Sequence, residues 1–204
     1  KGWAFVTPSS LGYTPDLDPW PQDVAKARKL LADAGYPGGQ GFGTLIVNTF
    51  VSTTMPFLPE SAQLAADFWK QELGLDVEVK VGDAVALARA NLTDALHGQI
   101  LWQDGVAKLD TSISYFTYYG SPTHGGRLHE TQELFDLVAK TLAVIDPDER
   151  VKAFNTLNKR GREESYHLGM GYVNIPWAVG PRVAAWQPWP LAAYPSNLHG
   201  ITLK

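Results

Sequence analysis

Two stretches, Thr44–Phe50 (TLIVNTF) and Leu75–Val81 (LDVEVKV), indicate the fold of this sequence. The first is apolar and rich in β-branched residues, as expected for a buried strand. The second alternates strictly, which places Val77, Val79 and Val81 on one covered face. The spacing leaves room for a helix between the two stretches. A strand, a helix and a strand in this order predict a right-handed crossover between two parallel strands.

The helix between these strands is predicted to begin at Ser61, a residue type that caps helices, and to end at Gly74, which allows a left-handed turn. Its inward side is predicted to consist of Leu64, Ala65, Phe68 and Leu73. A short helix near 84–96 then leads to a strand that ends at Trp102, a third parallel neighbour. Together these elements predict an α/β fold, with a mixed sheet that contains parallel strands and has helices on both faces.

Three further helices follow from apolar residues spaced three and four apart. One runs from Asp23 to Gly35, with the inward residues Val24, Ala27, Leu31 and Ala34. The second covers 133–145, with the inward residues Leu134, Val138, Leu142 and Ile145. The third is predicted to begin with Asp146 as its cap and Pro147 in its first turn, and to continue to about residue 166. Its inward residues are predicted to be Val151, Phe154, Leu157 and Gly161.

The remaining segments complete a single predicted domain over 1–204. Two final strands are predicted over 171–178 and 182–186. The flanks, 1–21 and 187–204, are rich in Pro and aromatic residues, so we expect irregular segments there that contact or lead to another part of a longer protein. The sequence begins with Lys rather than Met, and we expect it to be a processed chain or part of a larger one.

Composition excludes several classes of function. The chain has 204 residues, of which 45% are hydrophobic and 19% charged, as in a globular protein. Its net charge of -4 and the lack of clustered Lys and Arg argue against nucleic acid as a partner. Cysteine is absent and the five histidines are scattered, and neither a GxSxG nor an HExxH motif occurs. We therefore expect no enzymatic activity, no metal site and no cofactor.

The segment Leu101–Gly105 (LWQDG) ends an apolar run and opens an aromatic-rich region. We interpret it as a strand that places Trp102 and Asp104 at the rim of a binding cleft. The aromatic residues that follow are Tyr115, Phe116, Tyr118 and Tyr119. Tyr and Trp combine apolar area with a polar tip, which suits a ligand cleft, although the same residues also complete cores. The local pattern over 111–119 leaves helix and loop open.

A resemblance to a known family runs over nearly the whole chain. Residues Pro21–Gly39 (PQDVAKARKLLADAGYPGG) look like the signature DPEKAKALLAEAGYPDG of the extracytoplasmic solute-binding proteins of ABC importers, the large family that binds peptides and nickel. The stretch 62–81 is similar to the helix and strand that follow in that family, and 146–150 to its D-x-x-x-R helix start. The ending, 200–204, is also similar. The resemblance implies the carboxyl-terminal lobe of a periplasmic-binding-protein-like type II fold.

The resemblance also implies site residues. In peptide-binding members, a Trp near the third strand is followed three residues later by an Asp that pairs with the amino terminus of the ligand. Trp102 matches that Trp, whereas Asp104 comes two residues later and Gly105 occupies the third position. A shift of one residue along an extended segment turns a side chain to the opposite face, so Asp110 is the second candidate, unless it caps a helix. The candidate ligand-binding residues are Trp102, Asp104, Asp110, Tyr115, Tyr118 and Arg127, the last as a two-pronged partner of a carboxylate.

The function implied by the resemblance is the binding of a peptide-like or other small polar solute for ABC-type import, as one half of a two-lobed clamp. The implied partners are the solute or short peptide, the missing amino-terminal lobe and the transporter permease, with membrane contact only through the transporter. The implied location is periplasmic, or extracellular with a membrane anchor. The alternative is a structural or interaction domain that docks a partner chain through its Trp- and Pro-rich ends.

Overall fold

The computed structural model describes residues 6–18, 20–93, 95–105, 108, 110–111, 114–115, 131–165, 167–173, 176–189 and 196–204. The chain divides into two compact units. Unit 1 consists of Lys1–Pro19, Gly105–Gly120 and Asp136–Lys204, and unit 2 of Trp20–Asp104 and Ser121–Phe135. The assignment of 1–204 to one domain stays a prediction, and each unit is described by itself.

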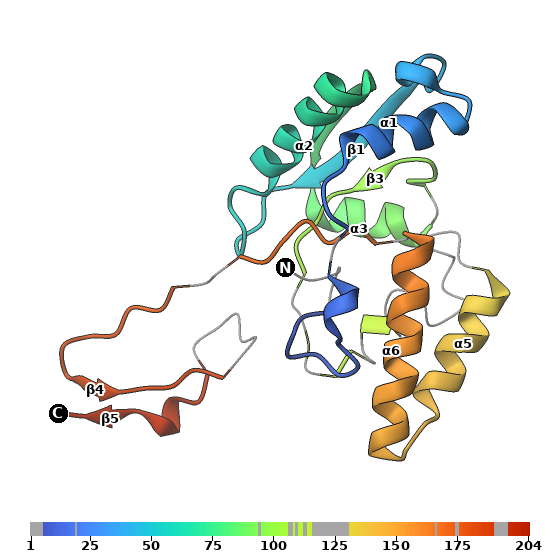
Figure 1. The fold of residues 1–204 in the computed structure, drawn as a ribbon. Coiled ribbons are helices and arrows are strands. Elements are labelled where there is room, and N and C mark those ends of the chain that lie inside the picture. Colours follow the sequence, from blue (N-terminus) through green and yellow to red (C-terminus); the bar gives the residue numbers. More distant parts are fainter. Residues whose placement is uncertain are drawn as a thin grey trace. The chain divides into compact units, whose positions relative to one another are not determined.

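Unit 2 is built on a three-stranded parallel sheet (Figure 1). Its strands are β1 (Thr44–Phe50), β2 (Asp76–Gly82) and β3 (Ile100–Leu101), in the order β2-β1-β3. In this register Val47 on β1 lies opposite Val79 on β2 and Ile100 on β3. The predicted crossover between parallel strands and the third parallel neighbour are both confirmed.

Helices cover both faces of this sheet, as predicted. The helices α1 (Val24–Asp33) and α2 (Leu58–Leu73) lie on one face and α3 (Ala84–Leu92) on the other (Figure 1). Aspartate side chains cap the amino-terminal ends of two of these helices, α1 and α3. Asp23 accepts a hydrogen bond from the amide of Lys26 at 2.9 Å, and Asp83 accepts one from the amide of Ala86 at 2.8 Å.

The inward side of α2 differs from the prediction. The helix begins at Leu58 rather than Ser61, and its buried residues are Leu58, Ala62 and Ala66. Leu64 is 72% exposed and Phe68 is 38% exposed. The small side chains of Ala62 and Ala66 allow α2 to pack closely on Val47 and Val77 of the sheet, and this leaves the larger side chains on the outer side.

In unit 1 a short connection joins α5 (Gln132–Leu142), whose first turn belongs to unit 2, to α6 (Pro147–Glu164) (Figure 1). Asp146 caps α6 as predicted, because its carboxylate accepts the amides of residues 148 and 149 at 3.1 and 3.0 Å. Two apolar residues predicted to face inward are exposed instead. Val151 is 42% exposed, and Ile145, which lies beyond the end of α5, is 90% exposed.

The core of unit 1 joins α6 to the segment 6–18. Phe154 and Leu157 of α6 are fully buried, as are Val6 and Leu17. The segment is held on α6 by side-chain amides: Asn155 donates to the carbonyl of Gly12 at 3.1 Å, and Asn158 donates to the same carbonyl at 3.3 Å. The segment 6–18 is therefore a fixed part of the unit, with one helical turn, η1 (Pro15–Leu17).

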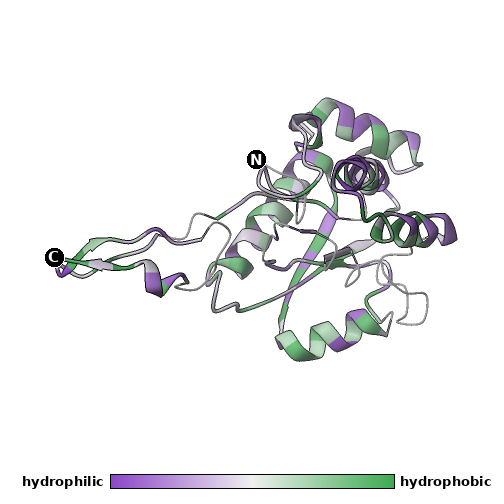
Figure 2. Cartoon of the chain, turned by 90° about the horizontal axis from the view of Figure 1, so that it is seen from below, coloured by the Kyte–Doolittle hydropathy of each residue, from purple (hydrophilic) through white to green (hydrophobic). Residues whose placement is uncertain are grey.

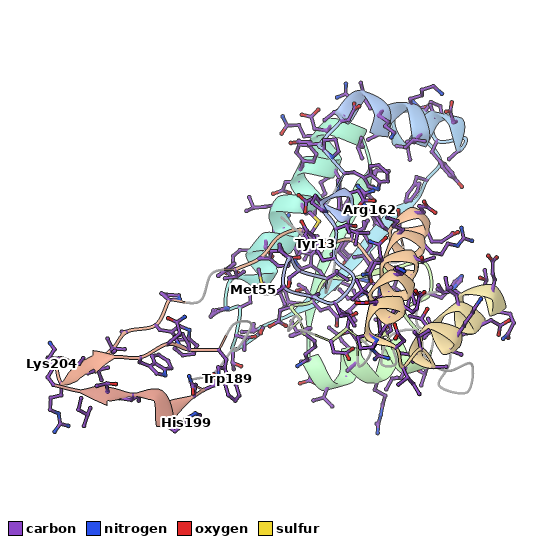
Figure 3. The ribbon with its side chains drawn as sticks, turned by 60° about the horizontal axis from the view of Figure 1, so that its bottom comes forward. Tyr13, Met55, Arg162, Trp189, His199 and Lys204 are labelled. Carbon is purple, nitrogen blue, oxygen red and sulfur yellow. The ribbon has the colours of Figure 1, made fainter. Side chains whose placement is uncertain are left out.

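Arg162 and the tyrosines Tyr13 and Tyr172 add contacts near the end of α6. Arg162 donates to the carbonyl of Asp18 at 2.7 Å, and the hydroxyl of Tyr13 donates to the carboxylate of Asp18 at 2.9 Å. Figure 3 labels Tyr13 and Arg162. The hydroxyl of Tyr172 donates to the carbonyl of Val6 at 2.5 Å. Burial, with the negative charges of Tyr13 and Asp18, raises the pKa of Tyr172 to about 12.

The last part of unit 1 is a two-stranded ribbon. The strand β4 (Val183–Ala185), within the predicted 182–186, pairs antiparallel with β5 (Thr202–Leu203) after the turn η4 (Leu198–Gly200). Figure 2 shows β4 as a mainly hydrophobic strand, and Figure 3 labels Trp189, His199 and Lys204 in the ribbon and its loop. The strand predicted over 171–178 is wrong for its described residues, which are irregular. The Tyr172 hydrogen bond to Val6 anchors that stretch through a side chain rather than through a strand ladder.

His167 predicts a pH dependence of stability. Burial lowers the pKa of His167 to about 4, whereas a histidine in an unfolded chain has a pKa of about 6.5. The unfolded state therefore binds the proton first as the pH falls, so stability is complete above about pH 6.5 and declines toward pH 4. Thermal midpoints of the full-length protein between pH 7 and pH 4.5 measure this decline. His167→Gln is expected to flatten it, and an unchanged slope in that variant would contradict the assignment to His167.

Candidate functional site

The carboxyl ends of β1 and β3 meet at one edge of the unit 2 sheet, because the two strands are parallel neighbours. The loop after β1 contains Ser52 and Thr54, and the segment after β3 contains Asp104. Ligands of open parallel α/β sheets bind beyond this edge. The predicted carboxylate therefore lies at the end of the sheet where a solute site is expected.

Two hydroxyl groups hold the carboxylate of Asp104. The hydroxyl of Ser52 donates to Oδ2 at 2.6 Å, and the hydroxyl of Thr54 donates to the same oxygen. Asp104 is half-buried, and it makes no ion pair within the described part of the chain. We define Ser52, Thr54 and Asp104 as the hydroxyl–carboxylate cluster.

Ser52 organises the loop on the β1 side of this cluster. Its side chain is buried, and its oxygen accepts the backbone amides of Thr54 at 3.2 Å and Met55 at 3.3 Å. Met55, labelled in Figure 3, is the last residue of this turn before the approach to α2. The buried hydroxyl therefore fixes the turn that presents Thr54 to the carboxylate.

Trp102 lies at the same edge but faces α2. Its backbone amide donates to the carbonyl of Asn48 at 2.8 Å, which extends the β3 pairing by one residue. Its indole nitrogen donates to the hydroxyl of Ser61 at 2.9 Å, and its ring meets Trp69 edge to face at 6.3 Å between centroids. Trp102 is half-buried against the core, so its main contacts in this structure join the sheet to α2.

Two other candidates belong to unit 1. The carboxylate of Asp110 pairs with Arg150 at 3.3 Å, so a cation of the protein itself already contacts it. Tyr115 is fully buried, its ring packs on Phe154, and its hydroxyl donates to the side-chain oxygen of Asn158. In this structure Tyr115 is a core residue. Tyr118 and Arg127 lie outside the described residues.

The structure thus brings Trp102 and Asp104 to one edge of unit 2, and their part in solute binding stays a prediction. Sequence reasoning missed Ser52, Thr54 and Ser61 as partners of these two residues. The position of Ser52 and Thr54 was a usable signal, since the polar run Ser52–Thr54 begins two residues after the end of β1. Hydroxyls at the carboxyl end of a parallel strand lie where ligands bind.

The carboxylate at this edge is a hydrogen-bond acceptor. A half-buried carboxylate with two hydroxyl donors can accept further hydrogen bonds from a cationic or polar group. Among the residues with described positions, no group of three His, Asp or Glu gathers in a way that could hold a metal ion. None of the described helices has the length and apolar character needed to span a membrane.

Comparison with known proteins gives a family. Residues 1–126 match the family described as bacterial extracellular solute-binding proteins, family 5 Middle. The glutathione-binding protein GsiB of Escherichia coli (strain K12) is 37% identical over 166 residues, which cover 73% of this chain and 30% of that protein.

Solved structures agree in fold. The oligopeptide-binding protein AppA of Bacillus subtilis, in complex with a nonapeptide, matches with a TM-score of 0.68 and 15% identity, over 99% of this chain and 42% of that one. The periplasmic binding protein DppA of Helicobacter pylori, in complex with the peptide STSA, matches with a TM-score of 0.64 and 22% identity, over 82% of this chain and 34% of that one. At such identities the likeness shows the fold alone, and it confirms a lobe of the periplasmic-binding-protein type II class.

The chain spans 30% of the length of GsiB and 42% of that of AppA. It therefore corresponds to a part of such proteins. The family match covers more than half of the chain, and the parallel sheet with helices on both faces agrees with it. This chain belongs to the bacterial extracellular solute-binding proteins of family 5.

Proposed function

We propose that this chain is one half of a two-lobed clamp that binds a peptide-like or other small polar solute for ABC-type import, without chemistry. The observation that supports this most directly is the half-buried carboxylate of Asp104 at the carboxyl edge of the sheet, held by Ser52 and Thr54. Family membership favours this function over a structural docking domain.

The other partners follow from the same proposal. The second lobe of the clamp is supplied by the amino-terminal part of the protein, and closure of the two lobes excludes water from the solute. The loaded protein delivers the solute to the permease of an ABC transporter, and it contacts the membrane only through that transporter or through its own anchor. The protein acts in the periplasm or on the outer side of the cell membrane.

Asp104 is proposed to accept a hydrogen bond from the amino group of the solute. A charge-assisted contact of this kind contributes more than a neutral hydrogen bond. Asp104→Asn keeps the shape of the side chain but removes its charge, and we expect it to weaken binding about 10- to 100-fold. Isothermal titration calorimetry of the full-length protein with glutathione, a dipeptide and a tetrapeptide measures this change.

The chain offers a matched control. Asp76 lies at the opposite, amino-terminal edge of the same sheet, where it accepts the hydroxyl of Thr44 at 2.5 Å. Asp76→Asn removes the same charge from a similar hydroxyl contact, so we expect unchanged affinity. A peptide with an acetylated amino group should bind the wild-type protein weakly, because it cannot make the charged contact with Asp104. Its affinity should therefore fall little further in the Asp104→Asn variant. The absence of heat with every peptide would refute the peptide form of the proposal.

A further inference from the structure

The two oxygens of the Asp104 carboxylate have different surroundings. Oδ2 accepts hydrogen bonds from the hydroxyls of Ser52 and Thr54. Within the described residues, Oδ1 has no hydrogen-bond partner. The loop after β1 therefore occupies Oδ2, and Oδ1 keeps its capacity to accept a hydrogen bond.

The direction of the hydroxyl protons follows from counting donors and acceptors. A serine hydroxyl has two lone pairs and one proton. Both lone pairs of Ser52 accept backbone amides, those of Thr54 and Met55. Its proton is thus left for an acceptor, and Asp104 Oδ2 at 2.6 Å is nearer than the hydroxyl oxygen of Thr54 at 2.9 Å. Because the lone pairs of Ser52 are in use, the Thr54 proton also goes to Oδ2.

Burial separates the roles of the two hydroxyl residues. Ser52 is only 7% exposed and belongs to the fixed turn after β1. Thr54 is exposed and contacts the carboxylate from the surface side of this turn. Removal of the Thr54 hydroxyl therefore changes the contact to Asp104 without opening the core.

We propose that Ser52 and Thr54 are positioning residues for solute binding: they hold Asp104 through Oδ2 so that Oδ1 is presented to a hydrogen-bond donor of the solute. This inference rests on the proposed function of Asp104. A carboxylate fixed in this way loses less side-chain freedom when a solute binds, so part of the affinity comes from residues that do not touch the solute.

The test uses Thr54→Val, which replaces the hydroxyl by a methyl group of similar size, in the full-length protein. Calorimetry with the tightest-binding peptide is expected to show an affinity about three- to tenfold lower than wild type, with an unchanged thermal midpoint. Thr54→Ser restores the hydroxyl and should restore the affinity. Thr44→Val is the matched control, because the Thr44 hydroxyl also donates to an aspartate, at the other edge of the sheet.

The outcomes separate this inference from the proposed function. Affinity that falls with Asp104→Asn but not with Thr54→Val overturns the positioning role and leaves the proposed function standing. Loss of affinity in Thr54→Ser equal to that in Thr54→Val also overturns it, since the hydroxyl would then not be the cause. A wild-type protein that binds no peptide overturns the peptide form of the proposed function, and this inference with it.

Discussion

Gly39→Ala is expected to destabilise unit 2 by about 2–5 kcal/mol, by adding a backbone clash to left-handed strain. Gly39 has φ of +79°, and a Cβ added there would lie 2.3 Å from the carbonyl oxygen of Gly74. Gly74 itself ends α2 in the left-handed conformation, with φ of +70°. The turn after α1 and the turn after α2 therefore touch backbone to backbone, and neither can move away without disturbing a helix end.

Gly41→Ala separates the two causes. Gly41 has φ of +77°, almost the value at Gly39, but a Cβ added at Gly41 would meet nothing within 4 Å. This variant should lose only the strain of the left-handed conformation, about 1–2 kcal/mol. The loss of stability in both variants is measured by thermal midpoints of the full-length protein and by hydrogen exchange of the β1 and β2 amides. Equal losses at the two positions would show that the contact with Gly74 contributes nothing.

Phe154→Ala is expected to cost unit 1 about 3–5 kcal/mol, the range for removal of a fully buried aromatic side chain. The ring of Phe154 packs on the ring of Tyr115, with 5.9 Å between their centroids. The guanidinium of Arg150 lies over the Phe154 ring, 5.0 Å from its centroid. The backbone of Gly12 also lies against Phe154, since a Cβ at Gly12 would be 2.6 Å from that of Phe154. The substitution thus loosens the core and the docking of segment 6–18 together.

Val151→Ala is the control on the same helix. Val151 lies one turn before Phe154 and is 42% exposed, so its shortening should change stability by about 0.5 kcal/mol or less. The two variants are compared by urea unfolding of the full-length protein, with hydrogen exchange of the α6 amides as the readout. If Phe154→Ala unfolds α6 no more readily than Val151→Ala does, then Phe154 is not the centre of this core.

The sequence alone predicted an element correctly where its residue types favour a single local structure. The β-branched run Thr44–Phe50 is a strand with the predicted limits, and Asp146 caps α6 because a carboxylate before Pro147 suits that position. The residue types in α2 did not determine which side of this helix faces the sheet. Two stripes at helical spacing are possible, and packing against the sheet favoured the one with Ala62 and Ala66 over the one with Leu64 and Phe68.

The candidate site was predicted in part for a similar reason. Asp104 and Trp102 follow an apolar run, so their place at the end of a strand was readable. Their partners Ser52 and Ser61 come from segments about forty to fifty residues earlier. The parallel register of β1 and β3 brings Ser52 to Asp104, and the packing of α2 on the sheet brings Ser61 to Trp102. The aromatic composition near Tyr115 also suits both a cleft and a core, and the contact with Phe154 shows that Tyr115 belongs to a core.

The docking of segment 6–18 on α6 has a consequence for the order of folding. The hydrogen bond from Asn158 to Gly12 joins residues 146 positions apart, whereas the three-stranded sheet of unit 2 and the helices α1, α2 and α3 lie within the continuous stretch Trp20–Asp104. Contacts between distant residues form slowly, because a long loop must close first. As the chain emerges from its amino end, unit 2 can form early, while Val6 and Leu17 must wait for α6 before they are shielded from water.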